Sequence, residues 1–414
     1  MTSSRLRLLW VKAGRLIPVD TGGKLRSYHL ARELASRHDL TMLTYYDGPR
    51  DPVYESDMGR EFPGAVTIRY GSSFGGRLAT GLRYLATIAS PAPFAVTKFT
   101  ASPVRTRIAE WARQRRFDAM ICDFLSASRN FEHPPPVPTI LFQHNVESSL
   151  WDRQARHAPN VVLRAVYGLE ALKMRRYERE TVETFRHIVA VSDHDRNSMM
   201  AMGDAGRITV VPTGVDGRRF REAASAEPTD PVVLFLGSMD WEPNIDGVEW
   251  MVREIWPRVR AAVPNAAFRI VGRTPDARIT RLAGDSVEVT GSVPSVEPWL
   301  AGATAFVVPL RIGGGTRLKI FEAMSAGRAV VSTTIGAEGL PVEHERNILL
   351  ADDATTFADA VIRVLTDADL RRRLGSSALS LAAEHDWSSV VGVLERAIRE
   401  ACAESSVANP ASED

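Results

Sequence analysis

The chain has 414 residues, of which 44% are hydrophobic and 24% charged, and its formal net charge is +1. This composition is typical of a soluble globular protein, and the length predicts two domains. The near-neutral charge argues against nucleic acid as a partner. The two cysteines, Cys122 and Cys402, lack metal-ligand spacing and fit a reducing compartment. No apolar run is long enough to span a membrane, and we expect a cytoplasmic protein without a signal peptide.

The first 45 residues predict a strand, a helix and a second strand. Leu6–Val11 and Leu40–Tyr45 are apolar runs typical of buried strands, and Lys24–Arg37 has a helical pattern. Gly22 and Gly23 stand in the loop before the helix, as in nucleotide-binding α/β folds. Their spacing is not GxGxxG, which argues against NAD, and a tight turn without a ligand explains the pair equally well.

The next region contains an uncharged segment and a basic one. No charged residue lies between Arg83 and Lys98, but this segment is too short to cross a bilayer. Five arginines then stand against a single acidic residue, Glu110: Arg105, Arg107, Arg113, Arg115 and Arg116. One interpretation is a basic surface that contacts a lipid-linked acceptor at a membrane; the other is a solvated helix face.

A polar cluster, Gln143–Glu147, follows a predicted strand at Thr139–Phe142. Open α/β sheets bind ligands at the carboxyl ends of their strands, so His144 is a candidate site residue. A lone histidine is more often structural, which is the alternative here. Glu147 suits the first turn of a following helix, where a carboxylate interacts favourably with the helix dipole.

Two carboxylate pairs have the spacing of an Asp-x-Asp metal motif: Asp193 with Asp195, and Asp367 with Asp369. Ser192 and Thr366 precede them, and a hydroxyl residue followed three positions later by an acidic one is a helix-capping pattern. We prefer the capping interpretation, and the sequence contains no other convincing metal-ligand cluster. No metal is therefore predicted.

The second half of the chain has its own series of strands. The polar segment Arg218–Pro231 is interpreted as a linker. A buried strand at Val232–Leu236 is followed by Gly237 and Ser238, and two later strands run into Gly272-Arg273 and Gly291-Ser292-Val293. These turns lie where a parallel sheet would bind a ligand.

The central stretch of the sequence is PLRIGGGTRLKIFEAMSAG, residues 309–327. A strand at Ala305–Val308 precedes three glycines, Gly313, Gly314 and Gly315, and a helix is predicted from Thr316 to Ala326. Glycines let the backbone approach a ligand closely, and a helix N-terminus favours an anion. Arg317 and Lys319 place two cations in the first turn, where they oppose the helix dipole and so indicate a bound anion.

Glu322 lies seven residues after Gly315, on the same helix face and about 10 Å further along the axis. With a diphosphate on the glycines, a nucleoside ribose would reach this carboxylate, which can accept hydrogen bonds from two vicinal hydroxyls. The alternative is a turn followed by a surface pair between Lys319 and Glu322.

This stretch resembles the donor-site signature of the retaining glycosyltransferases of family 4 (glycosyl transferases group 1), which have the GT-B fold. In that family a glutamate, seven residues and a second glutamate mark the site, and the second binds the donor ribose. Here Glu322 takes the second position, but Gly314 stands in the first. The match is to a variant with a triple glycine followed by Thr-Arg-Leu-Lys, and it leaves open what replaces the first glutamate at the donor sugar.

The resemblance implies roles for residues elsewhere. The Gly22-Gly23 pair would face the donor phosphates, His144 would lie beside the donor sugar and diphosphate, and backbone groups near Val293 would meet the nucleobase. The family often has an arginine at the position of Ser238 and a lysine near Asn244, so phosphate binding is assigned to Arg317 and Lys319. The predicted catalytic residues are His144, Arg317 and Lys319. The predicted donor-binding residues are Gly22, Gly23, Gly237, Ser238, Arg273, Val293, Gly313, Gly314, Gly315, Thr316 and Glu322.

The implied fold class is α/β, with two Rossmann-like domains whose parallel sheets face a cleft. Residues 1–212, joined by a C-terminal helix at about 386–402, would form an acceptor-side domain, and residues 213–385 a nucleotide-sugar donor domain. Residues 403–414 are small and acidic and are expected to be disordered.

The implied function is a retaining, metal-independent, hexosyltransferase-like enzyme with no obligatory cofactor. It would use a UDP- or GDP-sugar and a glycan, lipid-linked or small-molecule acceptor in cell-surface polysaccharide or glycoconjugate synthesis, with peripheral contact at the inner membrane surface as one interpretation. Alternatives are an epimerase-like enzyme of the same fold, which would need an acid–base carboxylate pair that is not found beside His144, and a non-catalytic scaffold.

Overall fold

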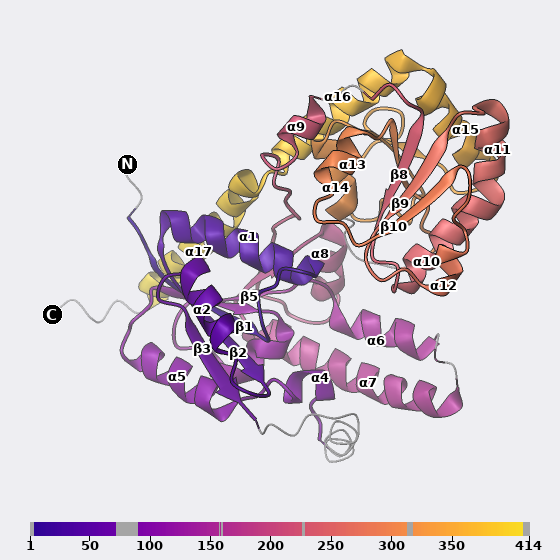
Figure 1. The fold of residues 1–414 in the computed structure, drawn as a ribbon. Helices are drawn as coiled ribbons and strands as arrows, with labels where there is room; N and C mark the ends of the chain where they lie inside the picture. Colours follow the sequence, from indigo (N-terminus) through magenta and orange to yellow (C-terminus); the bar gives the residue numbers. More distant parts are fainter. Residues whose placement is uncertain are drawn as a thin grey trace. The chain divides into compact units, whose positions relative to one another are not determined.

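The computed structural model describes residues 4–71, 90–156, 158, 160–225, 228–312 and 318–408. The chain forms two compact units, which are described in turn (Figure 1). Unit 1 comprises Met1–Pro212 with Val390–Asp414, and unit 2 comprises Thr213–Ser389. Both are α/β units with a parallel sheet, so the predicted fold class is confirmed.

Unit 1 is built on a seven-stranded parallel sheet of order β3-β2-β1-β4-β5-β6-β7. Its strands are β1 Arg7–Ala13, β2 Asp39–Asp47, β3 Val66–Tyr70, β4 Ala119–Asp123, β5 Thr139–Phe142, β6 His187–Ala190 and β7 Arg207–Val210. The strand order reverses between β1 and β4. Open parallel sheets bind ligands beyond the carboxyl ends of the strands at such a switch point.

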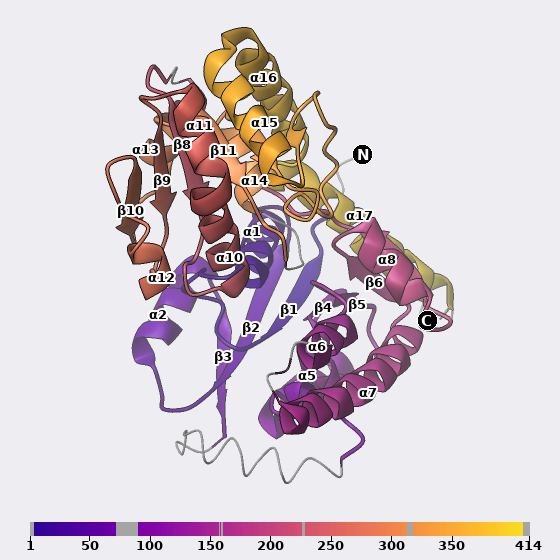
Figure 2. The same cartoon turned by 90° about the vertical axis from the view of Figure 1, so that its right-hand side faces the viewer.

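Helices cover both faces of this sheet (Figure 2). They are α1 Gly22–Arg37, α2 Pro52–Glu61, α4 Phe94–Thr97, α5 Ser102–Arg113, the 3-10 helix η1 Leu125–Asn130, α6 Glu147–Arg156, α7 Val161–Thr184, α8 Asp193–Met200 and α17 Trp387–Ala408. Because both faces are covered, the central strands are buried on both sides and read as continuous apolar runs. Helix α17 is anchored to unit 1 by ion pairs, including Arg37 to Glu395 at 3.3 Å and Arg207 to Glu400 at 3.2 Å.

Unit 2 contains a six-stranded parallel sheet of order β10-β9-β8-β11-β12-β13. Its strands are β8 Val232–Leu236, β9 Ala267–Val271, β10 Val287–Gly291, β11 Ala305–Val308, β12 Ala329–Ser332 and β13 Leu349–Leu350. Its helices are α9 Arg221–Ala224, α10 Glu242–Trp250, the π-helix η2 Met251–Ile255, α11 Trp256–Ala262, α12 Ala277–Thr280, α13 Glu297–Ala301, α14 Leu318–Ser325, α15 Ala354–Thr366 and α16 Ala368–Glu384. The switch point of this sheet lies between β8 and β11.

Several sequence expectations need correction. Residues 242–262 form the helices α10 and α11, which the π-helical turn η2 separates. Ser192 caps α8 as predicted, but Asp367 itself, not Thr366, caps α16 by accepting a hydrogen bond from the Leu370 amide. The expectation of disorder is wrong for residues 403–408, which continue helix α17, while 409–414 lie outside the described residues. Within the described ranges, no helix is long and apolar enough to cross a membrane.

Glycine at position 272 allows the chain after β9 to approach the chain after β8 at the carboxyl ends of the two strands. A Cβ built on Gly272 would lie 1.6 Å from the carbonyl oxygen of Gly237, a distance that no side chain can occupy. The Gly237 amide donates to the Val271 carbonyl at 3.0 Å, so this backbone contact continues the ladder between the two strands. Glycine is therefore required at 272 by close packing, and no other residue meets that requirement.

We predict that Gly272→Ala lowers the free energy of unfolding by about 3 kcal/mol, because the new methyl group must displace backbone. The measurement is urea denaturation, with Gly284→Ala as the control, since a Cβ at Gly284 has no atom within 4 Å. Equal stabilities for the two variants would contradict the close approach.

Candidate functional site

A buried ionic network lies at the carboxyl ends of β1 and β4, at the switch point of unit 1. Lys12 and Asp123 are paired across the two strands, and the Lys12 Nζ lies 3.2 Å from Asp123 Oδ2. The indole Nε1 of Trp10 donates to the same oxygen at 2.8 Å, and Oδ1 lies 2.7 Å from His144 Nε2. Burial alone would raise the pKa of Asp123, but Lys12 and His144 hold it well below its usual value. The carboxylate is therefore ionised and fully used within the protein.

The partners of His144 define its protonation. An ionised carboxylate can only accept, so Nε2–H donates to Asp123. The other ring nitrogen, Nδ1, lies 3.2 Å from a guanidinium nitrogen of Arg26, which can only donate. Burial lowers the pKa of His144 to about 4, with Lys12 and Arg26 adding to the effect and Asp123 opposing it. His144 is thus a neutral imidazole with both nitrogens engaged.

The start of α1 lies beside His144. A Cβ added to Gly23 would come 4.0 Å from His144 Nδ1, and Thr21 caps the helix by accepting from the Lys24 amide. Arg26, one turn into α1, is 5% exposed, and burial lowers its pKa to about 10, so it stays protonated at neutral pH. The structure therefore brings Gly22, Gly23 and His144 together at one edge of the sheet.

Phe124 follows directly after Asp123 and has a strained backbone. Its φ of 80° and ψ of 154° fall in a region that is essentially restricted to glycine and costs other residues about 1–3 kcal/mol. Its ring meets the His144 ring edge-on, with centroids 5.4 Å apart, and Phe142 packs on the same imidazole at 4.5 Å. The two aromatic rings hold the imidazole in place.

The segment after His144 is fixed by a carboxylate from α7. Glu178 accepts hydrogen bonds from the backbone amides of Glu147 and Ser148 at 3.0 and 3.1 Å, and from the Ser148 hydroxyl at 2.7 Å. It thereby satisfies free amides at the N-terminus of α6. Burial, together with the neighbouring Glu178 charge, raises the pKa of Glu147 from 4.5 to about 7.

We predict that Asp123→Asn destabilises the protein by about 3–5 kcal/mol, because Lys12 would remain buried without its counter-charge. Urea denaturation at pH 7 measures this loss. The double variant Lys12→Met/Asp123→Asn should recover much of the stability. A single variant as stable as the wild type would show that the buried pair contributes nothing.

We predict that Glu147→Gln changes the pH dependence of stability. The folded-state pKa lies above the ordinary value, so the contribution of Glu147 is intact below about pH 4.5 and is lost as the pH rises to about 7. At pH 8 the variant should be more stable than the wild type by about 3 kcal/mol, and at pH 4 the two should agree. Thermal unfolding between pH 4 and 8 tests this, with Glu180→Gln on the exposed side of α7 as control. A constant difference across the range would argue against a raised pKa.

In unit 2, Lys319 of α14 lies at the carboxyl end of β8. Its Nζ donates to Asn244 Oδ1 at 3.0 Å and stands 4.4 Å from the centre of the Phe235 ring. Asn244 in turn donates to the Ser238 carbonyl at 2.8 Å. A Cβ on Gly237 would lie 2.9 Å from the Lys319 Nζ, so the position must be glycine for the ammonium to reach this edge. The sequence analysis noted Asn244 only because it stands near a position where the family often has a lysine. In the structure its side chain orients Lys319 of α14.

Glu322 lies one turn after Lys319 and is half-buried. Its carboxylate has no hydrogen-bond partner among the residues that the structure describes. Burial raises its pKa, while the charges of Arg219 and Lys319 oppose the rise. Arg219 itself is paired with Glu297. As far as the described residues go, Glu322 therefore has acceptor oxygens that form no hydrogen bond, and the charges of two cations act on them.

The remaining predicted donor residues are only partly placed. Arg273 donates to the Ser238 hydroxyl at 3.0 Å, so these two come together after β9 and β8. Val293 follows β10 and packs against the core of unit 2. Gly313, Gly314, Gly315, Thr316 and Arg317 lie outside the described residues. Their roles stay predictions.

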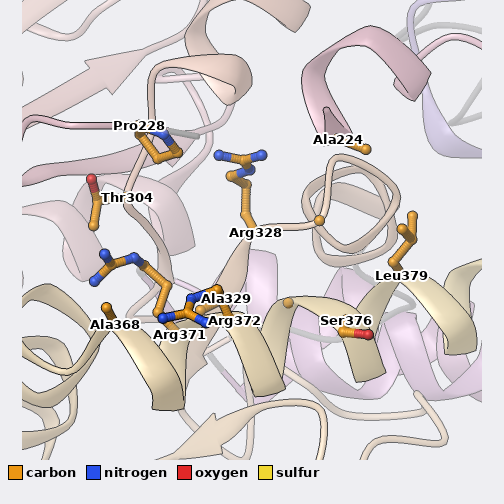
Figure 3. A pocket seen from close by; sticks show the side chains of 12 residues that line it. Ala224, Pro228, Thr304, Arg328, Ala329, Ala368, Arg371, Arg372, Ser376 and Leu379 are labelled. Carbon is orange, nitrogen blue, oxygen red and sulfur yellow. The ribbon is translucent and has the colours of Figure 1, made fainter. Parts of the chain in front are cut away.

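A different pocket of unit 2, of about 410 Å³, lies at the opposite edge of the sheet (Figure 3). Thr304 and Ala329, at the amino ends of β11 and β12, line it. Its buried Arg328 donates to the backbone carbonyls of Ala223, Ala303 and Ala326 at 2.8, 3.2 and 2.7 Å. The pocket therefore lies away from the carboxyl ends of the strands, and its buried arginine ties three chain segments together.

The sequence prediction missed the charged partners of the candidate residues: Lys12, Arg26, Asp123, Arg219 and Glu297. Two of them left a signal. Lys12 interrupts an apolar strand, and Asp123 is the last residue of one. A charge inside a buried parallel strand needs a partner, and adjacent strand ends are the first place to look.

Comparisons with solved structures identify the fold. Sucrose-phosphate synthase from Thermosynechococcus elongatus superposes with a TM-score of 0.69 at 18% identity, covering 97% of this chain and 100% of that one. Anabaena Alr3699/HepE in complex with UDP-glucose gives 0.62 at 13% identity, covering 97% and 100%. At these identities the likeness shows the fold alone, which is GT-B.

Two family models match the sequence. Residues 22–219 match Glycosyltransferase Family 4, and residues 230–367 match Glycosyl transferases group 1. The chain belongs to this family of glycosyltransferases, which confirms the resemblance stated from the sequence.

Curated relatives match over parts of their length. A phosphatidyl-myo-inositol mannosyltransferase of Mycolicibacterium smegmatis is 30% identical over 50% of this chain and 55% of its own. A 44.6 kDa protein encoded in the cps region of Klebsiella pneumoniae is 28% identical over 37% and 42%. A GDP-mannose:cellobiosyl-diphosphopolyprenol alpha-mannosyltransferase of Komagataeibacter xylinus is 26% identical over 51% and 55%. The chain thus spans about half the length of these relatives.

Proposed function

We propose that the protein is a retaining, metal-independent glycosyltransferase that moves a hexose from a UDP- or GDP-sugar to a glycan or lipid-linked acceptor. The observation that carries the proposal is the Glu322 carboxylate near Lys319, which has no hydrogen-bond partner in the described part of the chain and lies inside the segment that matches the group 1 model. A carboxylate without a partner close to two cations suits a ligand that has both hydroxyl and phosphate groups.

In unit 2, Glu322 would accept hydrogen bonds from the two ribose hydroxyls of the nucleotide. The Lys319 ammonium, held by Asn244, would bind the diphosphate. Charge develops on the diphosphate as the bond to the sugar breaks, and a cation that is already oriented stabilises that charge without reorganising. Arg317, which lies outside the described residues, is proposed as a second cation.

In unit 1, we assign His144 to positioning and not to proton transfer. A general base needs a free lone pair in reach of the acceptor hydroxyl, and the one lone pair of this neutral ring faces Arg26. In the proposed retaining mechanism a donor phosphate oxygen takes the acceptor proton, so no protein base is required. Gly22 and Gly23 would present backbone amides at the start of α1 to a phosphate group.

The names of relatives support a lipid-linked acceptor. Phosphatidyl-myo-inositol and cellobiosyl-diphosphopolyprenol are the acceptors named for two of them, and GDP-mannose is a donor named for one. The arginines of the basic segment are all exposed: Arg105, Arg107, Arg113, Arg115 and Arg116. We propose that they contact anionic lipid at the inner membrane surface during synthesis of a cell-surface glycan.

We predict that Glu322→Ala weakens the binding of UDP or GDP by about 10- to 100-fold, since two hydrogen bonds to an ionised group are lost. The measurement is calorimetric titration in EDTA, with Glu384→Ala at the exposed end of α16 as the matched control. Equal affinity of Glu322→Ala and wild type would refute this donor site. A wild type that binds neither nucleotide would refute the proposed function.

A further inference from the structure

The strained backbone of Phe124 is held from both sides. Its amide donates to the Phe142 carbonyl at 2.8 Å, and its carbonyl accepts a weak bond from the Cys122 thiol at 3.6 Å. The sheet and the start of η1 therefore impose the conformation. Glycine would adopt it without steric cost, so a phenylalanine at this position indicates that the ring has a role.

The described contacts of the Phe124 ring are aromatic. One contact is edge-on to His144, with the two ring planes at 77°. The residue as a whole is half-buried and does not belong to the buried core. It lies at the carboxyl end of β4, at the switch point where sheets of this kind bind ligands.

The chemistry around the ring indicates the ligand. The polar groups nearest to it, the Asp123 carboxylate and the His144 imidazole, already have their hydrogen-bond partners in the protein. What remains for a ligand is therefore an apolar, flat surface. Binding pockets combine such aromatic surfaces with a few polar groups, and a hexose matches this because it has an apolar C–H face and a rim of hydroxyls.

We propose that the Phe124 ring is a platform on which the C–H face of a hexose packs. The inference deepens the proposed function, on which it rests, by naming the residue that contacts sugar in unit 1. The hexose has two sources, the donor's transferred sugar or a sugar of the acceptor. In both cases the ring contacts the same feature, the C–H face of the hexose.

The test uses two variants that remove the ring, Phe124→Ala and Phe124→Gly, and one that keeps it, Phe124→Tyr. Saturation-transfer NMR with methyl α-D-glucopyranoside and methyl α-D-mannopyranoside should give a signal for the wild type and Phe124→Tyr. The signal should be lost in the other two. Phe124→Gly should melt at a higher temperature than Phe124→Ala, because glycine relieves the backbone strain. A loss of the NMR signal in both variants is therefore not explained by unfolding.

Calorimetric titration of each protein variant separates the two sources of the hexose. The affinity for UDP is compared with that for UDP-glucose, and the affinity for GDP with that for GDP-mannose. If the hexose is the donor's, the preference for nucleotide-sugar over nucleotide falls by about 3- to 10-fold without the ring. If it is the acceptor's, that preference is unchanged while the methyl hexoside signal is lost. Unchanged signals and unchanged preference in both Phe124→Ala and Phe124→Gly would overturn the platform. Because Glu322 is intact in every variant, nucleotide binding continues to report on the proposed function separately.

Discussion

The buried carboxylate of Asp123 is the constraint on which the site in unit 1 depends. It has no exposure to solvent, yet it is kept ionised by Lys12 on the neighbouring strand and by the donors Trp10 and His144. An ionised group in this position is tolerated only when every lone pair has a partner. The same requirement fixes the orientation of the imidazole, which lies against the Phe124 ring and the start of α1.

In unit 2, close packing of the backbone fixes the side chains of the candidate site. Gly272 lets the ends of β8 and β9 meet, and the missing side chain of Gly237 leaves room for the Lys319 ammonium. Asn244 holds that ammonium, so the lysine is oriented before any ligand arrives. Glu322 lies one turn further along α14, and no described residue forms a hydrogen bond with its oxygens. The site in unit 1 is thus organised by charge compensation, and the one in unit 2 by absent side chains.

The fold could be predicted from the sequence because parallel strands buried on both faces are continuous apolar runs. Thr139–Phe142 and Val232–Leu236 were predicted with the bounds that the structure gives. The edge strand β3 and the two-residue β13 were missed, since neither has such a run. Motif spacing identified single candidates such as Glu322. The partners of these candidates were missed because they are distant in the sequence: Trp10 and Asp123, for example, are 113 residues apart. A single sequence does not show which distant polar groups come into contact.

Helix α17 has a consequence for how the protein is made. Its first residues, up to Ser389, belong to unit 2, and from Val390 onward it belongs to unit 1. Unit 1 is therefore discontinuous in the chain and receives its last helix only after all of unit 2 has been translated. On the ribosome, unit 1 is synthesised first, but its surface for α17 stays uncovered until that helix has been made. Unit 2 is synthesised later and can complete its core before unit 1 does. The order of synthesis and the order of completion are reversed.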